Sequence, residues 1–194
     1  MEEDYVVGVL TDYSRLDEIY SLTHDSLVDA KYIAPRIDGR VIASPNLDEI
    51  PETSIVTAEK NGEIIATVTI TLTNPHGLPT DQYFKDETEA ICENGKVSVG
   101  VISRIATVKQ HRTNTRLTMN TLFRGLEIMQ ASSCHIVLFV VAEKHIRFYK
   151  RFFEAEIIAS KMTAIDKGID IPMVLMQAGV QRGWEVFNAG TKRT

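Results

Sequence analysis

Residues Ile102–Phe123, ISRIATVKQHRTNTRLTMNTLF, decide the fold, because a strand, a basic turn and an amphipathic helix follow one another there. The first part is β-branched and apolar, which favours a strand, and we extend this strand back to Lys96. In the helix, large apolar side chains recur at i, i+3, i+4, i+7 and i+10, namely Met119, Leu122, Phe123, Leu126 and Met129. This helix is therefore predicted to pack one face on a core.

The turn between the strand and the helix carries Lys109, His111, Arg112 and Arg116 in an acidic protein. The free N–H groups of a helix's first turn point at such a segment, which makes it a candidate anion site. The alternative is a solvated loop whose charges only keep the protein soluble. The local pattern leaves both interpretations open.

Two further patterns extend the sheet. Asn61-Gly62 separates two β-rich runs, and this dipeptide favours a tight type I′ hairpin turn. The run His135–Val141, HIVLFVV, is apolar throughout, which is typical of a strand buried on both faces. Since the Met119–Met129 helix precedes this run, a strand–helix–strand crossover is predicted between Val97–Val108 and His135–Val141.

The other expected elements surround this centre. Strands are predicted at Tyr5–Thr11, Ala155–Met162 and Ile171–Gly179, and helices at Leu16–Ile33, within Pro75–Asn94, at Glu143–Phe153 and in the tail, where Trp184 and Phe187 would dock it. The connector Ala34–Thr53 is long, and long ordered loops are often functional. We expect one domain, residues 1–194, of the α/β (α+β) class, with one mixed sheet and helices on its faces.

Composition excludes several classes of function. The formal net charge of −5 opposes general binding of nucleic acid. No apolar run approaches the roughly 20 residues that span a bilayer, and the acidic N-terminus, MEEDYVV, lacks the basic region of a signal peptide, so a cytoplasmic location is expected. Cys92 and Cys134 do not form a metal-ligand spacing and are predicted to be buried, reduced thiols.

The segment Ala142–Phe153, AEKHIRFYKRFF, predicts a short helix with one basic face. Lys144, His145, Arg147, Lys150 and Arg151 would form that face, which either is simply solvated or guides an acidic partner. Tyr149 on the same helix either packs in the core or points its hydroxyl at a site, where it could protonate a leaving group.

Four segments resemble the GNAT acyltransferase superfamily, and within it the N-acyl amino acid synthases and the acyl-homoserine lactone (autoinducer) synthases. They are the hairpin NGEIIATVTITL, the segment LPTDQYFKDE before the central strand, the Ser-Arg-aliphatic strand ISRIATV, and the helix AEKHIRFYKRFFEAEII. The resemblance covers roughly Leu16–Ala178. It implies a mixed, mostly antiparallel sheet whose fourth and fifth strands splay apart around an acyl-pantetheine arm.

The resemblance also implies roles for individual residues. Tyr149 would stand near the thioester sulfur as an acid, and Ser103 and Arg104 would belong to the catalytic strand. The acyl donor would be held by Ile105, Ala106, Val108, Gln110, Arg112, Thr113, Thr115 and Arg116. A basic patch of Lys144, Arg147, Lys150 and Arg151 would meet an acidic carrier protein. No metal and no tightly bound cofactor are expected.

The turn departs from the family pattern. The family has Gln/Arg-x-x-Gly-x-Gly/Ala, whereas this chain has Gln110–Thr115 with threonine at both glycine positions. Glycine lets a backbone approach a pyrophosphate closely, so its absence disfavours coenzyme A. Acyl carrier protein presents a single phosphodiester and is acidic, which suits this turn and the basic helix.

A second departure concerns the general base. The relatives carry Glu two residues before the Ser-Arg pair, where this chain has Val101, which accepts no proton. Either the amine arrives already deprotonated, or another group serves as the base through water, with Glu89, Glu93 and His145 as unranked candidates. We expect an N-acyltransferase that moves a medium or long fatty acyl group from acyl carrier protein to an amino-acid-like amine. Phe139, Val141, Phe148 and the helix within Pro75–Asn94 would supply apolar walls for the acyl chain. The alternatives are an acetyl-coenzyme A-dependent N-acetyltransferase, an autoinducer synthase and a non-catalytic acyl binder.

Overall fold

The computed structural model describes residues 5–93, 96–165 and 169–191. Residues 1–4 of the acidic N-terminus, Asn94 at the end of the second predicted helical region, and residues 192–194 of the tail lie outside the described residues. Within the described residues, no helix combines the length and the apolar character needed to cross a bilayer.

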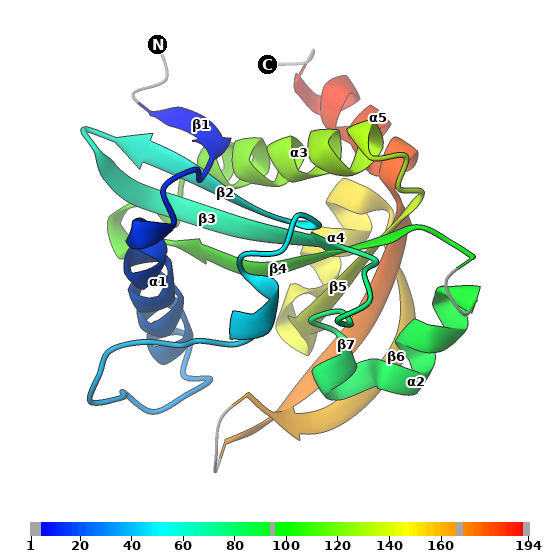
Figure 1. The fold of residues 1–194 in the computed structure, drawn as a ribbon, viewed down its shortest axis with the longest axis horizontal. Coiled ribbons are helices and arrows are strands. Elements are labelled where there is room, and N and C mark those ends of the chain that lie inside the picture. The colour runs from blue at the N-terminus through cyan, green and yellow to red at the C-terminus, as the bar shows by residue number, and fades with distance from the viewer. Residues whose placement is uncertain (1–4, 94–95, 166–168, 192–194) are drawn as a thin grey trace.

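Seven strands form one sheet in the described part of the chain, and helices cover both of its faces (Figure 1). The strands are β1 Val6–Val9, β2 Thr53–Lys60, β3 Glu63–Leu72, β4 Val99–Thr107, β5 Ile136–Ala142, β6 Glu156–Ala164 and β7 Asp170–Gly179. The α-helices are α1 Leu16–Asp29, α2 Asp81–Ile91, α3 Thr115–Ala131, α4 Ile146–Phe153 and α5 Val180–Thr191. Short 3₁₀ turns lie at η1 Tyr13–Arg15, η2 Pro45–Leu47, η4 Lys109–His111 and η5 Glu143–His145.

The sheet order is β1-β2-β3-β4-β5-β7-β6, and every neighbouring pair is antiparallel except β4 and β5. The predicted mixed, mostly antiparallel sheet is therefore confirmed, as is the crossover through α3. The hairpin turn is also confirmed, because Asn61 and Gly62 both have positive φ, 53° and 84°, as a type I′ turn requires.

The two faces of the sheet carry different helices. On one face, α3, α4 and α5 pack over a core that contains Phe139, Leu126 and Phe153. On the other face, α1 packs over β3 and β4, and α2 packs against β6 around the fully buried Phe84. The predicted apolar face of α3 is confirmed, since Leu122, Leu126 and Met129 are each at most 1% exposed.

The C-terminal helix α5 lies beside α3, as Figure 1 shows. Phe187 stacks on Phe123 of α3 with the ring centroids 4.1 Å apart, and Trp184 stacks on the same ring at 6.3 Å. These are the two residues predicted to dock the tail. The buried thiols are confirmed as well, because Cys92 and Cys134 are both buried and free.

Candidate active site

Strands β4 and β5 separate halfway along their length. They pair only from Val99 to Ile102 on β4 and from Ile136 to Phe139 on β5. Beyond these residues each strand continues, β4 to Thr107 and β5 to Ala142, without pairing with the other. The splayed pair implied by the family resemblance is therefore confirmed.

A bulge in β4 lies at the point of separation. The register against β3 shifts between Thr67 and Thr69, where β4 supplies an extra residue. Arg104 occupies the bulge with φ of +47°, a left-handed conformation that is rare for a residue with a side chain. Because a bulge bends its own strand and increases the local twist, it turns the end of β4 away from β5.

A cleft of about 870 Å³ opens between the parted strands. This volume lies within the range of roughly 300–1,000 Å³ that is usual for small-molecule sites. Both strands line the cleft, together with α1, the connector after it, α3 and α4. The wall includes Ile102–Ala106 of β4, Val140–Ala142 of β5, Thr23, Ser26, Leu27, Tyr32, Arg112, Thr115, Thr118, Leu122, His145, Phe148, Tyr149, Arg151 and Phe152.

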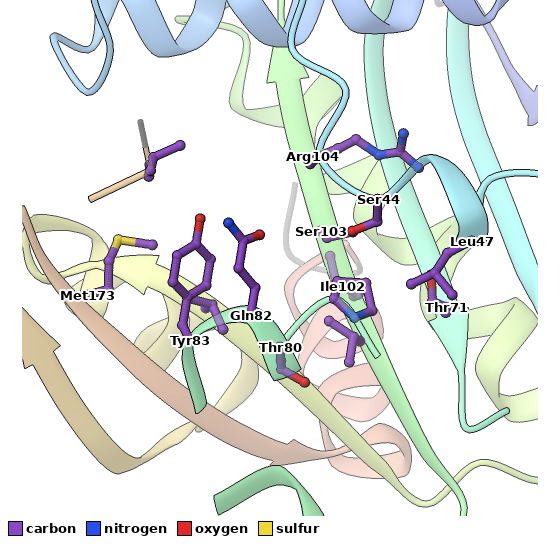
Figure 2. A pocket seen from close by; sticks show the side chains of 15 residues that line it. Ser44, Leu47, Thr71, Thr80, Gln82, Tyr83, Ile102, Ser103, Arg104 and Met173 are labelled. Carbon is purple, nitrogen blue, oxygen red and sulfur yellow. The ribbon is translucent and has the colours of Figure 1, made fainter. Parts of the chain in front are cut away.

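A smaller cavity of about 150 Å³ adjoins the cleft on the α2 side of the sheet. The two spaces share wall residues, among them Ser103, Arg104 and Met173, so they are parts of one site. Figure 2 shows Gln82 and Tyr83 of α2 standing between Met173 on one side and Ser103 of β4 on the other. Burial raises the pKa of Tyr83, which keeps its hydroxyl protonated.

Arg104 is held by two residues from the other side of the site. Its Nη2 donates to Oδ1 of Asp48, and the Tyr20 hydroxyl donates to Oδ2 of the same carboxylate at 2.6 Å. Burial, and next the hydrogen bond to Asp48, raise the pKa of Tyr20 to about 12. The other amino group of Arg104, Nη1, is buried and has no hydrogen-bond partner in the described part of the chain. One donor at the wall of both cavities is therefore left without an acceptor.

Tyr149 lies in the wall of the cleft on α4. Its ring packs on Phe139 of β5 and on Phe148, with centroid distances of 4.7 and 5.2 Å. The residue is only 6% exposed, and this burial raises the pKa of its hydroxyl well above the ordinary value for tyrosine. The hydroxyl is thus protonated at physiological pH and can act as a proton donor to a leaving group.

The predicted donor-binding residues fall into two groups. Four of them line the cleft, namely Ile105, Ala106, Arg112 and Thr115. Val108, Gln110, Thr113 and Arg116 do not line it, and Val108 instead packs against the core beside α1 and β2. Of the predicted apolar walls, Val141 and Phe148 line the cleft, whereas Phe139 is fully buried behind Tyr149.

Side chains of the turn before α3 already occupy some of the hydrogen-bonding groups there. Asn114 caps the helix, because its Oδ1 accepts the N–H of Leu117 at 3.0 Å. The Arg112 guanidinium donates to the Thr107 carbonyl at 3.0 Å and pairs with Asp29 of α1 at 2.8 Å. Fewer backbone donors are therefore left for an anion than in a glycine-rich turn.

The basic face of η5 and α4 is exposed beside the cleft. Lys144, Arg147, Lys150 and Arg151 are all solvent-exposed, and none forms an ion pair with a carboxylate in the described ranges. Arg151 also reaches the cleft wall, so the patch and the site are continuous. Lys144 lies over the Tyr32 ring, with Nζ 4.5 Å from the centroid.

The three candidate bases differ in position. Val101 is buried and lines the smaller cavity, so the position at which relatives carry Glu does face the site. Glu89 is exposed on α2 beside Lys85, and Glu93 follows α2; neither lines either cavity. His145 does line the cleft, and its Nε2 lies 3.2 Å from the Tyr32 hydroxyl.

Several site residues were not identified from the sequence. The connector Ala34–Thr53, singled out only for its length, supplies Val41, Ala43 and Ser44 to the walls and Asp48 to Arg104. Nothing in the sequence pattern distinguishes Asp48 or Tyr20 from other polar loop and helix residues. Among the residues that the structure describes, no group of three or more His, Cys, Asp or Glu side chains could hold a metal ion.

Comparison with known proteins gives a consistent result. The family model described as N-acyl amino acid synthase FeeM matches residues 18–179. No curated protein matches the chain in sequence. The structure of FeeM, an N-acyl amino acid synthase from uncultured soil microbes, has a TM-score of 0.75 and 14% identity, covering 92% of each chain.

Two other solved structures share the fold. BjaI, a coenzyme A-dependent acyl-homoserine lactone synthase, has a TM-score of 0.68 and 14% identity, covering 95% of this chain and 88% of BjaI. A GNAT-family acetyltransferase from Streptococcus pneumoniae has a TM-score of 0.62 and 18% identity, covering 90% of this chain and 99% of the other. At these identities the likeness to the solved structures concerns the fold.

Proposed function

The chain belongs to the N-acyl amino acid synthase FeeM family and is an N-acyltransferase, and from this premise we propose that it moves a fatty acyl group from acyl carrier protein to the amine of an amino acid. The observation that carries the proposal is the separation of β4 from β5 after Ile102 and Phe139, with a cleft of about 870 Å³ between them. The pantetheine arm of the donor occupies this cleft, where the unpaired backbone of β4 can hydrogen-bond to its amides.

The reaction is aminolysis of a thioester. The amine nitrogen attacks the thioester carbonyl carbon, and the carbonyl oxygen becomes an oxyanion that backbone N–H groups of the parted β4 stabilise. The nitrogen gives up one N–H proton to solvent, and the tetrahedral intermediate collapses with loss of the thiolate, which takes a proton from the Tyr149 hydroxyl. The Tyr149 phenolate is then reprotonated from solvent. Protonation in place makes the thiol a better leaving group, and the position of Tyr149 in the cleft wall supports this role.

Two features support acyl carrier protein as the donor. Asn114 uses one N–H of α3 for its own cap, and Arg112 is already paired with Asp29, so the turn is better suited to one phosphate than to a pyrophosphate. The exposed basic patch beside the cleft complements an acidic carrier domain and would speed its encounter with the site.

One feature supports an amino acid as the acceptor. Arg104 Nη1, at the wall of both cavities, is a buried donor for which the described residues supply no acceptor. The carboxylate of an amino acid supplies the acceptor that this group lacks, and a charge-assisted bond of this kind is stronger than one to a neutral acceptor. The paired Asp48 fixes the guanidinium while Nη1 remains available.

A donor-by-acceptor comparison tests the function. Purified protein is incubated with palmitoyl- or acetyl-loaded acyl carrier protein, or with the matching coenzyme A thioesters, and with a mixture of the twenty amino acids. Mass spectrometry then detects N-acyl products. We expect N-palmitoyl amino acid from the carrier-bound donor at a kcat/KM at least tenfold above that from palmitoyl-coenzyme A. Equal or better use of the coenzyme would overturn the carrier assignment, and product from acetyl thioesters alone would identify an acetyltransferase.

A further inference from the structure

Among the described residues, the side chains that line the cleft carry hydroxyl groups, cations and one imidazole. No aspartate or glutamate lines either cavity in the described ranges, and the position of the family glutamate is Val101. Within the part of the chain that the structure describes, the ionisable side chains in the walls are Tyr32, Tyr83, Arg104, Arg112, His145, Tyr149 and Arg151. Arginines are cations and tyrosines are phenols at neutral pH, so neither accepts a proton readily. Of these side chains, His145 is the one that can accept a proton near neutral pH.

His145 faces the same space as the proposed acid. His145, Phe148, Tyr149 and Phe152 all line the cleft, and their spacing of i, i+3, i+4 and i+7 places them on one side of η5 and α4. The imidazole is therefore about one helical turn from Tyr149, in the direction of the connector after α1. The residue is exposed and lines the cleft, so that protons can exchange with solvent.

Tyr32 reaches His145 from the opposite wall. It follows α1, packs against the core on the α2 side of the sheet and lines the cleft, and its hydroxyl lies 3.2 Å from His145 Nε2. With Nε2 unprotonated, the hydroxyl donates to it. Lys144 lies over the Tyr32 ring, and among the described residues Lys144 and Tyr32 are the titratable groups that the structure places against the imidazole.

On this basis, and resting on the function proposed above, we propose that Tyr32 and His145 form a proton relay that replaces the missing carboxylate base. As the amine nitrogen forms its bond to the thioester carbon, one N–H proton passes to the Tyr32 oxygen. The Tyr32 hydroxyl proton passes at the same time to His145 Nε2, which becomes an imidazolium. The C–S bond then breaks, the sulfur takes the Tyr149 proton, and the imidazolium returns its proton to solvent, from which the Tyr149 phenolate is reprotonated.

The state of His145 suits this role. Partial withdrawal of the ring from water, and next the positive charge of Lys144, lower the pKa of His145 below its ordinary value. The imidazole is therefore neutral at the start of the reaction. The relay predicts that kcat/KM falls at low pH as His145 becomes protonated. The pKa that this acid limb reports should lie below that of an ordinary histidine.

The experiment measures acyl transfer from palmitoyl-acyl carrier protein to the amino acid that the wild-type chain uses best. We expect His145→Gln and Tyr32→Phe each to lower kcat by about 100-fold or more, while the affinity for the loaded carrier changes less than threefold. The double variant should be no slower than the slower single variant, because the two groups act as one unit. His135→Gln, an exposed histidine outside the site, is the matched control and should retain the wild-type rate.

Chemical rescue separates catalysis from structure. Added imidazole should raise the acyl-transfer rate of His145→Ala at least tenfold. It should leave the wild-type rate and the His135→Gln rate unchanged. A His145→Gln chain that transfers within threefold of wild type, or losses that multiply in the double variant, would overturn the relay while the proposed function stands. A wild-type chain that acylates no amine from either donor would overturn the proposed function and the relay together.

Discussion

Arg104 on β4 and Asp48 after η2 are 56 positions apart in the sequence and form a buried ion pair beside both cavities. Their side chains are 7% and 1% exposed, and Tyr20 from α1 completes the cluster. The pair thus ties α1, the long connector and the bulged strand together. A bulge residue with positive φ is costly, and this cluster is the surrounding structure that holds it in place.

Removing the negative charge from this pair should be strongly destabilising. Asp48→Asn leaves the Arg104 guanidinium buried and uncompensated, so we expect the free energy of unfolding to fall by about 3–5 kcal/mol. Urea denaturation measures this change. Glu127→Gln, which breaks the exposed pair with Arg124, is the control and should change stability by less than about 1 kcal/mol. Similar losses in both variants would contradict a structural role for the pair.

The Tyr20 hydroxyl should contribute to stability in a pH-dependent way. Because its pKa is raised to about 12 in the folded chain, its contribution is complete below the unfolded value of about 10 and is lost as the pH rises towards 12. Tyr20→Phe should therefore be less stable than wild type by about 1.5–3 kcal/mol at pH 8. Unfolding measured between pH 8 and pH 12 should show this gap closing, and a constant gap would refute the assigned pKa.

Tyr149→Phe keeps the ring packing on Phe139 and removes only the proton donor. We expect kcat to fall by roughly 10²–10⁴ with little change in the affinity for the acyl donor. The assay is release of free thiol from loaded carrier protein in the presence of the acceptor. Tyr13→Phe, at an exposed tyrosine of η1, is the matched control. Unchanged turnover in Tyr149→Phe would remove the acid role.

Charge reversal on the basic face should raise KM for the carrier-bound donor alone. Arg147→Glu combined with Lys150→Glu should raise KM for acyl-carrier protein about tenfold at low salt, and added salt should reduce this difference. KM for a small acyl-pantetheine donor should stay unchanged, because that donor does not meet the patch. Lys96→Glu, at an exposed lysine before β4, is the control. An equal effect on both donors would argue against a docking surface.

Local patterns were sufficient for most of the elements. The i, i+3, i+4 spacing predicted α3 and its buried face, and Asn61-Gly62 predicted the hairpin with its two positive φ angles. These features depend on residues within a few positions of one another, so the sequence contains them directly. The resemblance to acyltransferases added the splay of β4 and β5, which periodicity alone does not indicate.

The candidate site was predicted in part. Ser103, Arg104 and Tyr149 were identified from their motifs, and all three line the cleft. Asp48 lies in a connector without periodic pattern, and Tyr32 lies at the end of a predicted helix whose pattern gives it no special role. Neither was identified, because they meet their partners across 56 and 113 positions. His145 was one of three unranked bases, and only its position in the cleft wall distinguishes it from Glu89 and Glu93.

The sequence by itself determined the order of strands and helices, the apolar faces that bury them and the chemical groups on β4 and α4. Only the tertiary structure decided where β4 separates from β5, that Asp48 pairs with Arg104, and that the Tyr32 hydroxyl contacts the His145 imidazole. The physical reason is range: helix and hairpin preferences are set by neighbours along the chain, whereas a bulge, a buried ion pair and a cross-cleft hydrogen bond depend on groups that packing alone brings together.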